Sequence, residues 1–253
     1  MLSNSTSNNS ILLALAVGIA SLAGLAPSVK ASGLIDKAIL TDGNLAISGV
    51  AYIQGPVHTN GNFDIDGGST VTGLASAVGY VKNDGVNAPG AGANPGFLPG
   101  GFAAGAAAIA YPNMAAVVAA LGAPVDHEIF GNLILSGSNP FSGIYLVHGF
   151  VDISSDYAGT ATFLADNYID ISAFNGSVTG AVLNANFPFG LALYSATAYV
   201  NVSGDDTISG SIAAKTTANV SSAGPIQAPE PSSALLLGIG CLGAAMTRKR
   251  KKA

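Results

Sequence analysis

The sequence contains no tryptophan, a single cysteine (Cys241) and few charged residues, which make up 9% of its 253 positions. One cysteine cannot form an intramolecular disulfide. So small a charged fraction argues against a helical protein held together by salt bridges. A mean hydropathy of +0.48 excludes an intrinsically disordered chain, because such chains are polar and highly charged. The residues that do abound are small or apolar, with 33 glycines and 49% hydrophobic residues.

Basic residues are scarce in the middle of the chain. Five of the nine Lys and Arg residues lie at the C-terminal end, namely Arg248, Lys249, Arg250, Lys251 and Lys252. Between Ser32 and Ala228 there are three lysines, no arginine and 13 acidic residues, which leaves a net charge of −10. Because nucleic-acid binding depends on Lys and Arg that neutralise phosphates, we expect no nucleic-acid partner.

The N-terminus has the features of an export signal. An apolar run of 15 residues, Ile11 to Leu25, is too short to span a membrane and suits the central region of a signal peptide. Small residues at Val29 and Ala31 predict cleavage between Ala31 and Ser32. Residues 1–31 are therefore predicted to be a signal peptide, with the Sec translocon and signal peptidase as partners. A buried first helix of the folded domain is the alternative.

Three features follow one another at the C-terminus: the triplet Pro229, Glu230 and Pro231, an apolar stretch from Ala234 to Met246, and the basic run. In order, spacing and position they resemble the PEP-CTERM sorting signal of exported bacterial proteins, over about Pro229 to Lys252. The resemblance implies a transient inner-membrane anchor and cleavage near the triplet by an exosortase. The basic run would stay cytoplasmic as the stop, which places the middle of the chain outside. We expect a Pro-rich linker at 223–233 and a transmembrane sorting tail at 234–253.

A five-position pattern recurs in the middle of the chain, with apolar residues at its second and fourth positions and a small or polar residue at the third. Its copies are NLAIS from Asn44, FDID preceded by Asn62, and FVDIS, YIDIS and YVNVS from Phe150, Tyr168 and Tyr199. The intervals between successive copies are 18, 88, 18 and 31 residues. The 18-residue repeat of short strands and turns predicts an all-β fold, a parallel β-helix whose coils stack in phase. A sandwich or jelly roll is the alternative. The pattern also resembles, in a generic way, the β-solenoids of bacterial surface and bactofilin-like proteins.

The repeats are interrupted between two predicted blocks, 32–81 for the first coils and 129–222 for the main solenoid. The insertion at 82–128 begins with a stretch rich in Gly, Pro and Ala, which indicates an irregular loop. Its second half predicts a short helix from Met114 to Leu121, with Pro112 early and Gly122 as the stop. This helix is expected to lie against the solenoid or to cap one end.

The sequence favours an exported, non-enzymatic protein of the cell surface or exopolysaccharide matrix, which binds polysaccharide or copies of itself. We assign no catalytic, cofactor or metal residue, and His58, His127 and His148 have no metal-binding spacing. The alternative is a polysaccharide-active β-helix lyase or hydrolase. If the coils stack in register, Asp152 and Asp170 become neighbours about 5 Å apart and could act as a carboxylate pair or bind Ca²⁺. A third hypothesis is ice binding through the Thr-x-Thr triplets at 70–72 and 160–162.

Overall fold

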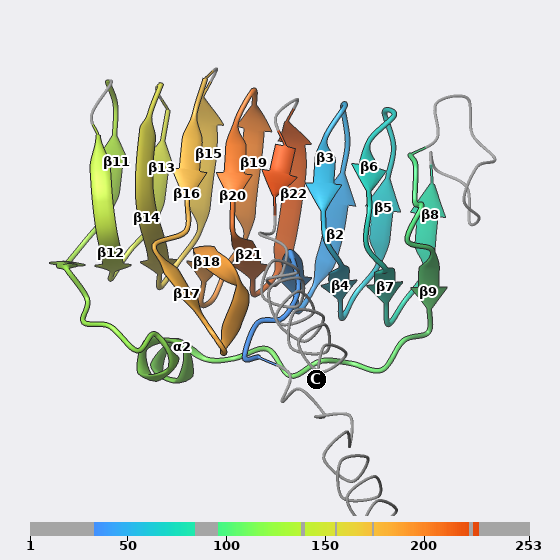
Figure 1. Cartoon of the computed structure of the whole chain (residues 1–253), viewed down its shortest axis with the longest axis horizontal. Helices are drawn as coiled ribbons and strands as arrows, with labels where there is room; N and C mark the ends of the chain where they lie inside the picture. The colour runs from blue at the N-terminus through green and yellow to red at the C-terminus, as the bar shows by residue number, and fades with distance from the viewer. Residues whose placement is uncertain are drawn as a thin grey trace, which may run out of the picture. The chain divides into compact units, whose positions relative to one another are not determined.

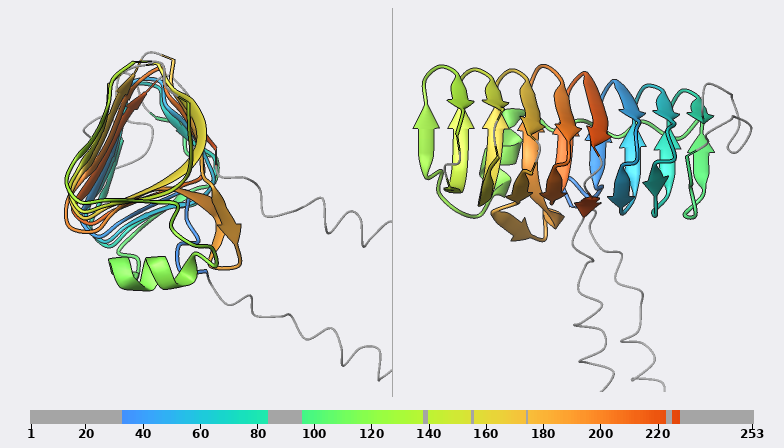
Figure 2. Two further views of the ribbon diagram at one scale, coloured as in Figure 1. Left: turned by 90° about the vertical axis from the view of Figure 1, so that its left-hand side faces the viewer. Right: turned by 90° about the horizontal axis from the view of Figure 1, so that it is seen from above.

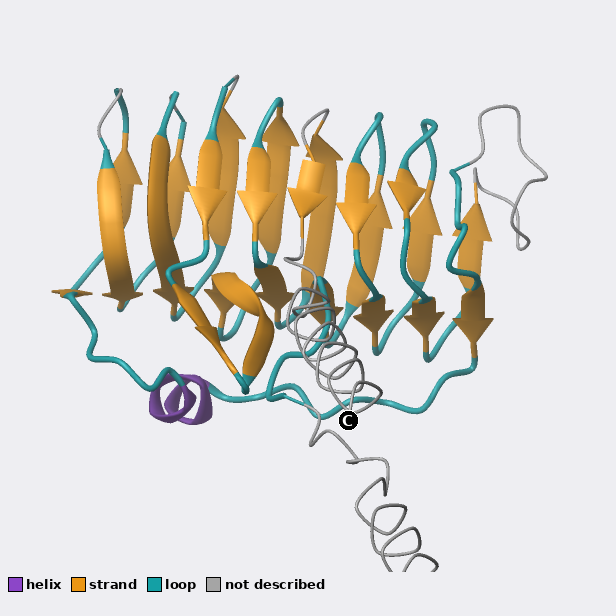
Figure 3. Cartoon of the chain, in the orientation of Figure 1, coloured by secondary structure: helices purple, strands orange, loops and turns teal. Residues whose placement is uncertain are grey.

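The computed structural model describes residues 33–83, 96–137, 140–154, 156–173, 175–222 and 225–227. These residues form short strands that follow one another around a common axis, so that each turn of the chain, or coil, stacks on the next (Figure 1). Viewed along the axis, the coils have a triangular outline with three flat sides (Figure 2). Strands joined by turns make up the coils, and a long loop that carries one helix runs along their outside (Figure 3).

The first side is a parallel sheet of eight strands. In spatial order these are β11 (Leu133–Leu135), β13 (Val151–Ile153), β15 (Ile169–Ala173), β19 (Val200–Gly204), β22 (Thr217–Ser222), β2 (Asn44–Ile47), β5 (Phe63–Ile65) and β8 (Val81–Asn83). Every copy of the five-position pattern lies in this sheet with its second position in register, as Val151, Ile169 and Val200 illustrate. The prediction of an all-β fold with parallel, in-phase strands is therefore confirmed for the described residues. The sandwich alternative is wrong, because sandwiches pair their strands antiparallel.

The other two sides belong to one 15-stranded sheet. It turns a corner because long strands pair with different neighbours along their lengths: β14 meets β16 through residues 158–160 and β18 through residues 163–165. The second side consists of the first halves of β12 (Phe141–Val147) and β14 (Ala158–Ala165), then β16 (Ser177–Thr179), β20 (Thr207–Ser209), β23 (Pro225–Gln227), β3 (Tyr52–Gln54) and β6 (Thr70–Val71).

The third side continues from the same long strands. It consists of β10 (His127–Ile129), the second halves of β12 and β14, β18 (Phe187–Ser195), β21 (Ser211–Ala214), β1 (Ile39–Thr41), β4 (Val57–Thr59), β7 (Ala75–Ala77) and β9 (Phe102–Ala104). The short strand β17 (Val182–Asn184) pairs antiparallel with β18. Each of the other strand pairs in the described residues is parallel.

The coils do not stack in the order of the sequence. The N-terminal strands lie in the middle of the solenoid, where β2 pairs with β22 and Leu45 is the partner of Ala218. From there the chain winds to the end formed by β8 and β9, returns along the outside through residues 105–126, and resumes at the opposite end with β10 (Figure 1). The C-terminal coils then wind back to meet the first. We call the meeting of β1, β2 and β3 with β21, β22 and β23 the seam.

Residues 105–126, the strap, carry the helix α2 (Met114–Ala120). Its first turn is capped by Asn113, whose side chain accepts a hydrogen bond from the backbone N–H of Ala116. Val117 is fully buried and Leu121 is 2% exposed, because this face of the helix packs on the third side. The predicted short helix is confirmed, and it lies against the side of the solenoid rather than over an end (Figure 2).

Three expected boundaries differ from the structure. The first block of coils does not stop at residue 81, since β8 extends to Asn83 and β9 completes a further coil at 102–104. The second block begins earlier than residue 129, because β10 starts at His127. The expected linker at 223–233 begins within the sheet, where β23 pairs with β20 and β3. A proline is tolerated there because Pro225 is the first residue of its strand.

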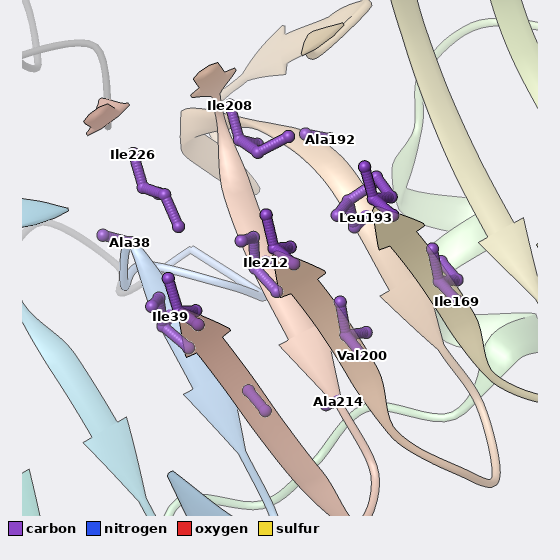
Figure 4. Close-up of a cluster of buried hydrophobic side chains, with 14 of the residues drawn as sticks. Ala38, Ile39, Ile169, Ala192, Leu193, Val200, Ile208, Ile212, Ala214 and Ile226 are labelled. Atoms are coloured by element: carbon purple, nitrogen blue, oxygen red, sulfur yellow. The ribbon is translucent and has the colours of Figure 1, made fainter. Parts of the chain in front are cut away.

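Inward-facing side chains fill the triangle with a continuous apolar core. Figure 4 shows part of it, where Leu193, Ile212 and Ile39 from three neighbouring strands lie in one row. Each of these residues is fully buried. Ala214 and Ala192 belong to the same buried core, which is close-packed with small as well as large side chains.

Candidate binding faces

The third side has an apolar outer surface that the strap covers, and we call it the covered side. Its outward row places Leu164 beside Tyr194, Tyr194 beside Ala213, and Ala213 beside Leu40. These residues are at most 1% exposed, and they form a second core with Val117 of α2. A large ligand therefore has no access to this part of the solenoid.

Side-chain hydrogen bonds to backbone groups hold the strap in place. The side chain of Asn60 makes two hydrogen bonds to the backbone of Ile109: it donates to the carbonyl (2.7 Å) and accepts from the N–H (2.9 Å). The Tyr194 hydroxyl donates to the carbonyl of Pro112 (2.6 Å), and burial raises the pKa of this tyrosine. Asn184 donates to the carbonyl of Leu121 (2.7 Å), which satisfies a backbone group that the end of a helix leaves without a partner.

No described element covers the first side, and it carries three of the four acidic residues that lie within described strands, so we call its outer surface the acidic face. Its central outward row, strand by strand, is Ile134, Asp152, Asp170, Asn201, Asn219, Ala46, Asp64 and Lys82. Asp152 and Asp170 are direct cross-strand partners, as the sequence predicted. Asn201 donates a hydrogen bond from Nδ2 to Oδ1 of Asp170 (3.0 Å), which links an amide and a carboxylate of neighbouring strands in the row.

Two further rows flank the central row of the acidic face. One is a serine row, in which Ser172, Ser203 and Ser221 are in register. The residue directly after each of three neighbouring strands extends this row, namely Ser136, Ser154 and Ser48. The other contains stacked aromatic rings: Phe150 and Tyr168 lie 4.6 Å apart between centroids, and Tyr168 and Tyr199 lie 5.0 Å apart. Because these rings face one another along the axis, they stabilise coil stacking and present their edges to a ligand.

The second side is also open, and its outer surface, the hydroxyl face, has a different chemistry. One outward row, in register, is Ser142, Thr160, Thr179, Ser209, Gln227 and Gln54. A neighbouring row includes Ser177, Thr207 and Thr70. None of the residues in these rows is charged, whereas the described strands of the acidic face carry three aspartates, Asp64, Asp152 and Asp170, and one lysine, Lys82.

The Thr-x-Thr triplets of the sequence account for only part of the hydroxyl face. Thr160 contributes to it, but Thr162 is fully buried, donates to the carbonyl of Leu191 (2.5 Å) and accepts from the N–H of Ala181 (3.2 Å). Such triplets leave out the serine hydroxyls of the face. A search for Ser or Thr at alternate positions would have found Ser177 with Thr179 and Thr207 with Ser209.

A buried carboxylate supports the corner between the acidic and hydroxyl faces. Asp206 is fully buried and accepts hydrogen bonds from the backbone N–H groups of Ala173 (3.3 Å) and Gly176 (3.1 Å). Burial, the largest cause, raises the pKa of Asp206 to about 6. These contacts hold a turn of the backbone, so the role of Asp206 in the fold is structural.

The three histidines lie apart from one another. His148 contacts Glu128 and Asp166, each at 3.0 Å, and hydrogen bonds to these two carboxylates raise its pKa. His58 is 2% exposed beneath the strap, and burial lowers its pKa. His127 stacks on Tyr145 with 4.4 Å between ring centroids. Within the described ranges no group of three or more His, Cys, Asp or Glu side chains could hold a metal ion.

The residues assigned to export and sorting lie outside the described part of the chain. They are Ala31, Ser32, Pro229, Glu230, Pro231, Arg248, Lys249, Arg250, Lys251 and Lys252. In the part that the structure describes, no helix has the length and apolar character needed to cross a membrane.

No family model and no curated protein matches the sequence. A structure search finds similarity to the crystal structure of an ice-binding protein from the Antarctic ascomycete Antarctomyces psychrotrophicus. The two chains are 12% identical, with a TM-score of 0.42, and the match covers 80% of this chain and 97% of the other. A similarity of this size assigns no family.

Proposed function

We propose that the protein is an exported, non-enzymatic structural component of the cell surface or exopolysaccharide matrix, which binds an extended polysaccharide through the acidic face. The observation that carries this proposal is repetition: Asp, Asn and Ser recur at the same positions on strand after strand. A repeating array suits a ligand that itself repeats, whereas catalysis requires one constellation unlike its surroundings. Carboxylate, amide and hydroxyl groups together supply both acceptors and donors for sugar hydroxyls.

Export and sorting form the second part of the proposal. We propose cleavage by signal peptidase between Ala31 and Ser32, a transient stay in the inner membrane, and cleavage by an exosortase near Pro229. The described strands, from Ile39 of β1 to Gln227 of β23, all lie between the two proposed cleavage sites. Cleavage at both sites would leave every described strand in the mature protein. Mass spectrometry of the exported protein tests the scheme: we expect ends near Ser32 and Pro229, and a product that retains Met1 would contradict it.

Binding and catalysis are separated by one experiment on residues 32–228. The purified protein is incubated with acidic and neutral polysaccharides, and both retention on the polymer and release of new chain ends are measured. We expect retention without release. The double variant Asp152→Asn/Asp170→Asn keeps the size and polarity of the row, and should change affinity for charged polymers only modestly. Chain-end release that the double variant abolishes would instead establish the polysaccharide-active enzyme.

A second candidate function, ice binding, is favoured by one observation, the uncharged hydroxyl face. Four hydroxyl side chains, from Ser142 to Ser209, occupy one row on adjacent parallel strands, which lie about 4.8 Å apart. Inhibition of ice recrystallisation tests this function. If ice binds there, Thr179→Lys should abolish the inhibition, while Asn219→Lys on the acidic face should leave it unchanged. Equal activity of both variants would exclude the hydroxyl face.

A further inference from the structure

The solenoid ends at β10 and β11 in an open coil. Within the described residues, β10 hydrogen-bonds only to β12, and β11 only to β13. Their other edges therefore present unpaired backbone groups. Apolar side chains are exposed beside these edges, with Phe130 82% and Ile134 60% exposed. Core-facing residues of this coil, such as Leu133, are only partly buried.

The opposite end, at β8 and β9, is open in the same way. Among the described strands, β8 pairs only with β5, and β9 only with β7. Phe102 is in register with Ala75, which is fully buried, and so occupies a core-facing position. Phe102 is nevertheless 45% exposed, because no described coil stacks beyond it. Exposed parallel edges with apolar side chains are sites at which another strand can add.

The two ends are complementary to each other. All coils wind in the same direction, so the free edge of β9 corresponds to the edge that β21 offers to β1 within the chain. The seam shows that such docking occurs without chain continuity, because it joins strands as distant in sequence as β1 and β21 through ordinary parallel pairing. A second copy of the chain provides an edge of this kind.

Aromatic side chains match across the two ends as well. At the β10 end, Phe163 and Tyr145 stack at 5.1 Å and Tyr145 and His127 at 4.4 Å, all in one core-facing row. The same row ends at Phe102 on the other side of the molecule. If a second copy continues the solenoid in register, its Phe102 ring meets the outer face of His127. Offset-stacked aromatic pairs of this kind are stabilising.

We infer that copies of this protein associate head to tail, the β8–β9 end of one docking on the β10–β11 end of the next. Both parallel sheets would then continue from one copy into another. The contact is heterologous, since it joins two different surfaces, and therefore does not close but generates a filament. The inference concerns the ends of the solenoid and is independent of which ligand the two faces bind.

Two variants, each blocked at one end, test this inference in residues 32–228. Phe102→Lys blocks the β9 end and Ile134→Lys blocks the β11 end, while Leu183→Lys changes an exposed leucine on β17 as the matched control. Analytical ultracentrifugation should show concentration-dependent oligomers for the wild type and the control, and monomers for each end variant alone. An equimolar mixture of the two end variants should form a 1:1 dimer and nothing larger, because one intact end remains on each.

The outcomes decide between the arrangements. If either end variant alone still dimerises, the contact joins like ends and the head-to-tail arrangement is wrong. A wild type that remains monomeric up to its solubility limit overturns the inference altogether. Circular dichroism and thermal melting establish that each variant is folded; if Phe102→Lys is not, Ala104→Lys on the same strand blocks the same end.

Discussion

The covered side and the acidic face belong to the same coils and differ in what their strands present outward. Leu164 on β14 and Asp170 on β15 follow each other around one coil, and the inward neighbours Phe163 and Ile169 are both fully buried. The inward rows of the two sides are thus both apolar and buried, and their burial accounts for the fold. The outward row decides whether a side is covered by the strap or left open to a ligand.

The largest expected difference between the two sides comes from truncating one outward side chain on each of them. Leu164→Ala leaves a cavity under the strap and should lower the free energy of unfolding by about 2–5 kcal/mol. Asn219→Ala on the acidic face should change it by less than about 0.5 kcal/mol, because Asn219 is exposed. Chemical denaturation of both variants measures the difference. Equal effects would mean that the strap does not pack on the coils in solution.

The corner between the open faces should respond to pH. Because folding raises the pKa of Asp206 to about 6, the folded state favours its protonated form. The contribution is fully favourable below the unfolded pKa of about 3.9 and is lost as pH rises through about 6, a change of at most about 3 kcal/mol. Asp206→Asn should remove this decline between pH 4 and pH 6.5 in denaturation curves. A decline that persists in the variant must come from another group.

Two asparagines on opposite sides give a smaller contrast. Asn60 on the covered side holds Ile109 of the strap by two hydrogen bonds, and Asn62 accepts one from the N–H of Tyr80 at the edge of the acidic face. Asn60→Ala should cost about 1–3 kcal/mol, because it leaves two backbone groups without partners. Asn62→Ala should cost about 1 kcal/mol or less. Hydrogen exchange should show lost protection at Ile109 only in the first variant.

Periodicity revealed the acidic face because its strands alternate in polarity. In Val151-Asp152-Ile153 and the corresponding strands, the two apolar residues face the core and the polar residue between them faces outward. The 18-residue spacing between copies gives the register of the strands. The covered side gave no such signal, since Phe163-Leu164-Ala165 is apolar at every position. Such runs indicate strands buried on both faces, and this feature could have revealed that something covers them.

The order of the coils could not be read from the repeats. Every coil has the same kind of strand edge. The strand that contains Leu45 could therefore pair with any other in-phase strand as well as with the strand of its observed partner, Ala218. What selects the seam is the strap, whose anchors at Asn60 and Asn184 fix where the chain re-enters the solenoid. Hydrogen bonds between residues so far apart in the sequence correspond to no local sequence pattern that could predict them.

The smallest effects are expected at two histidines, one under the strap and one beyond it. Burial lowers the pKa of His58, so its contribution to stability is present above the unfolded pKa of about 6.5 and is lost as pH falls. Hydrogen bonds to Glu128 and Asp166 raise the pKa of exposed His148, so its contribution is present below about 6.5 and is lost as pH rises through the folded pKa.

NMR titration of the two imidazoles should therefore place His58 below and His148 above the ordinary histidine pKa of about 6.5. Glu128→Gln removes a carboxylate that hydrogen-bonds His148 and should lower the pKa of that residue, while leaving the pKa of His58 unchanged because the hydrogen-bond partners of His58 are Ser76 and Asn60. Shifts of both histidines in the variant would show that the covered side and the open end of the solenoid are coupled. If His148 alone responds, the strap isolates His58 from the charges at the β10 end, as the separation of covered and open surfaces requires.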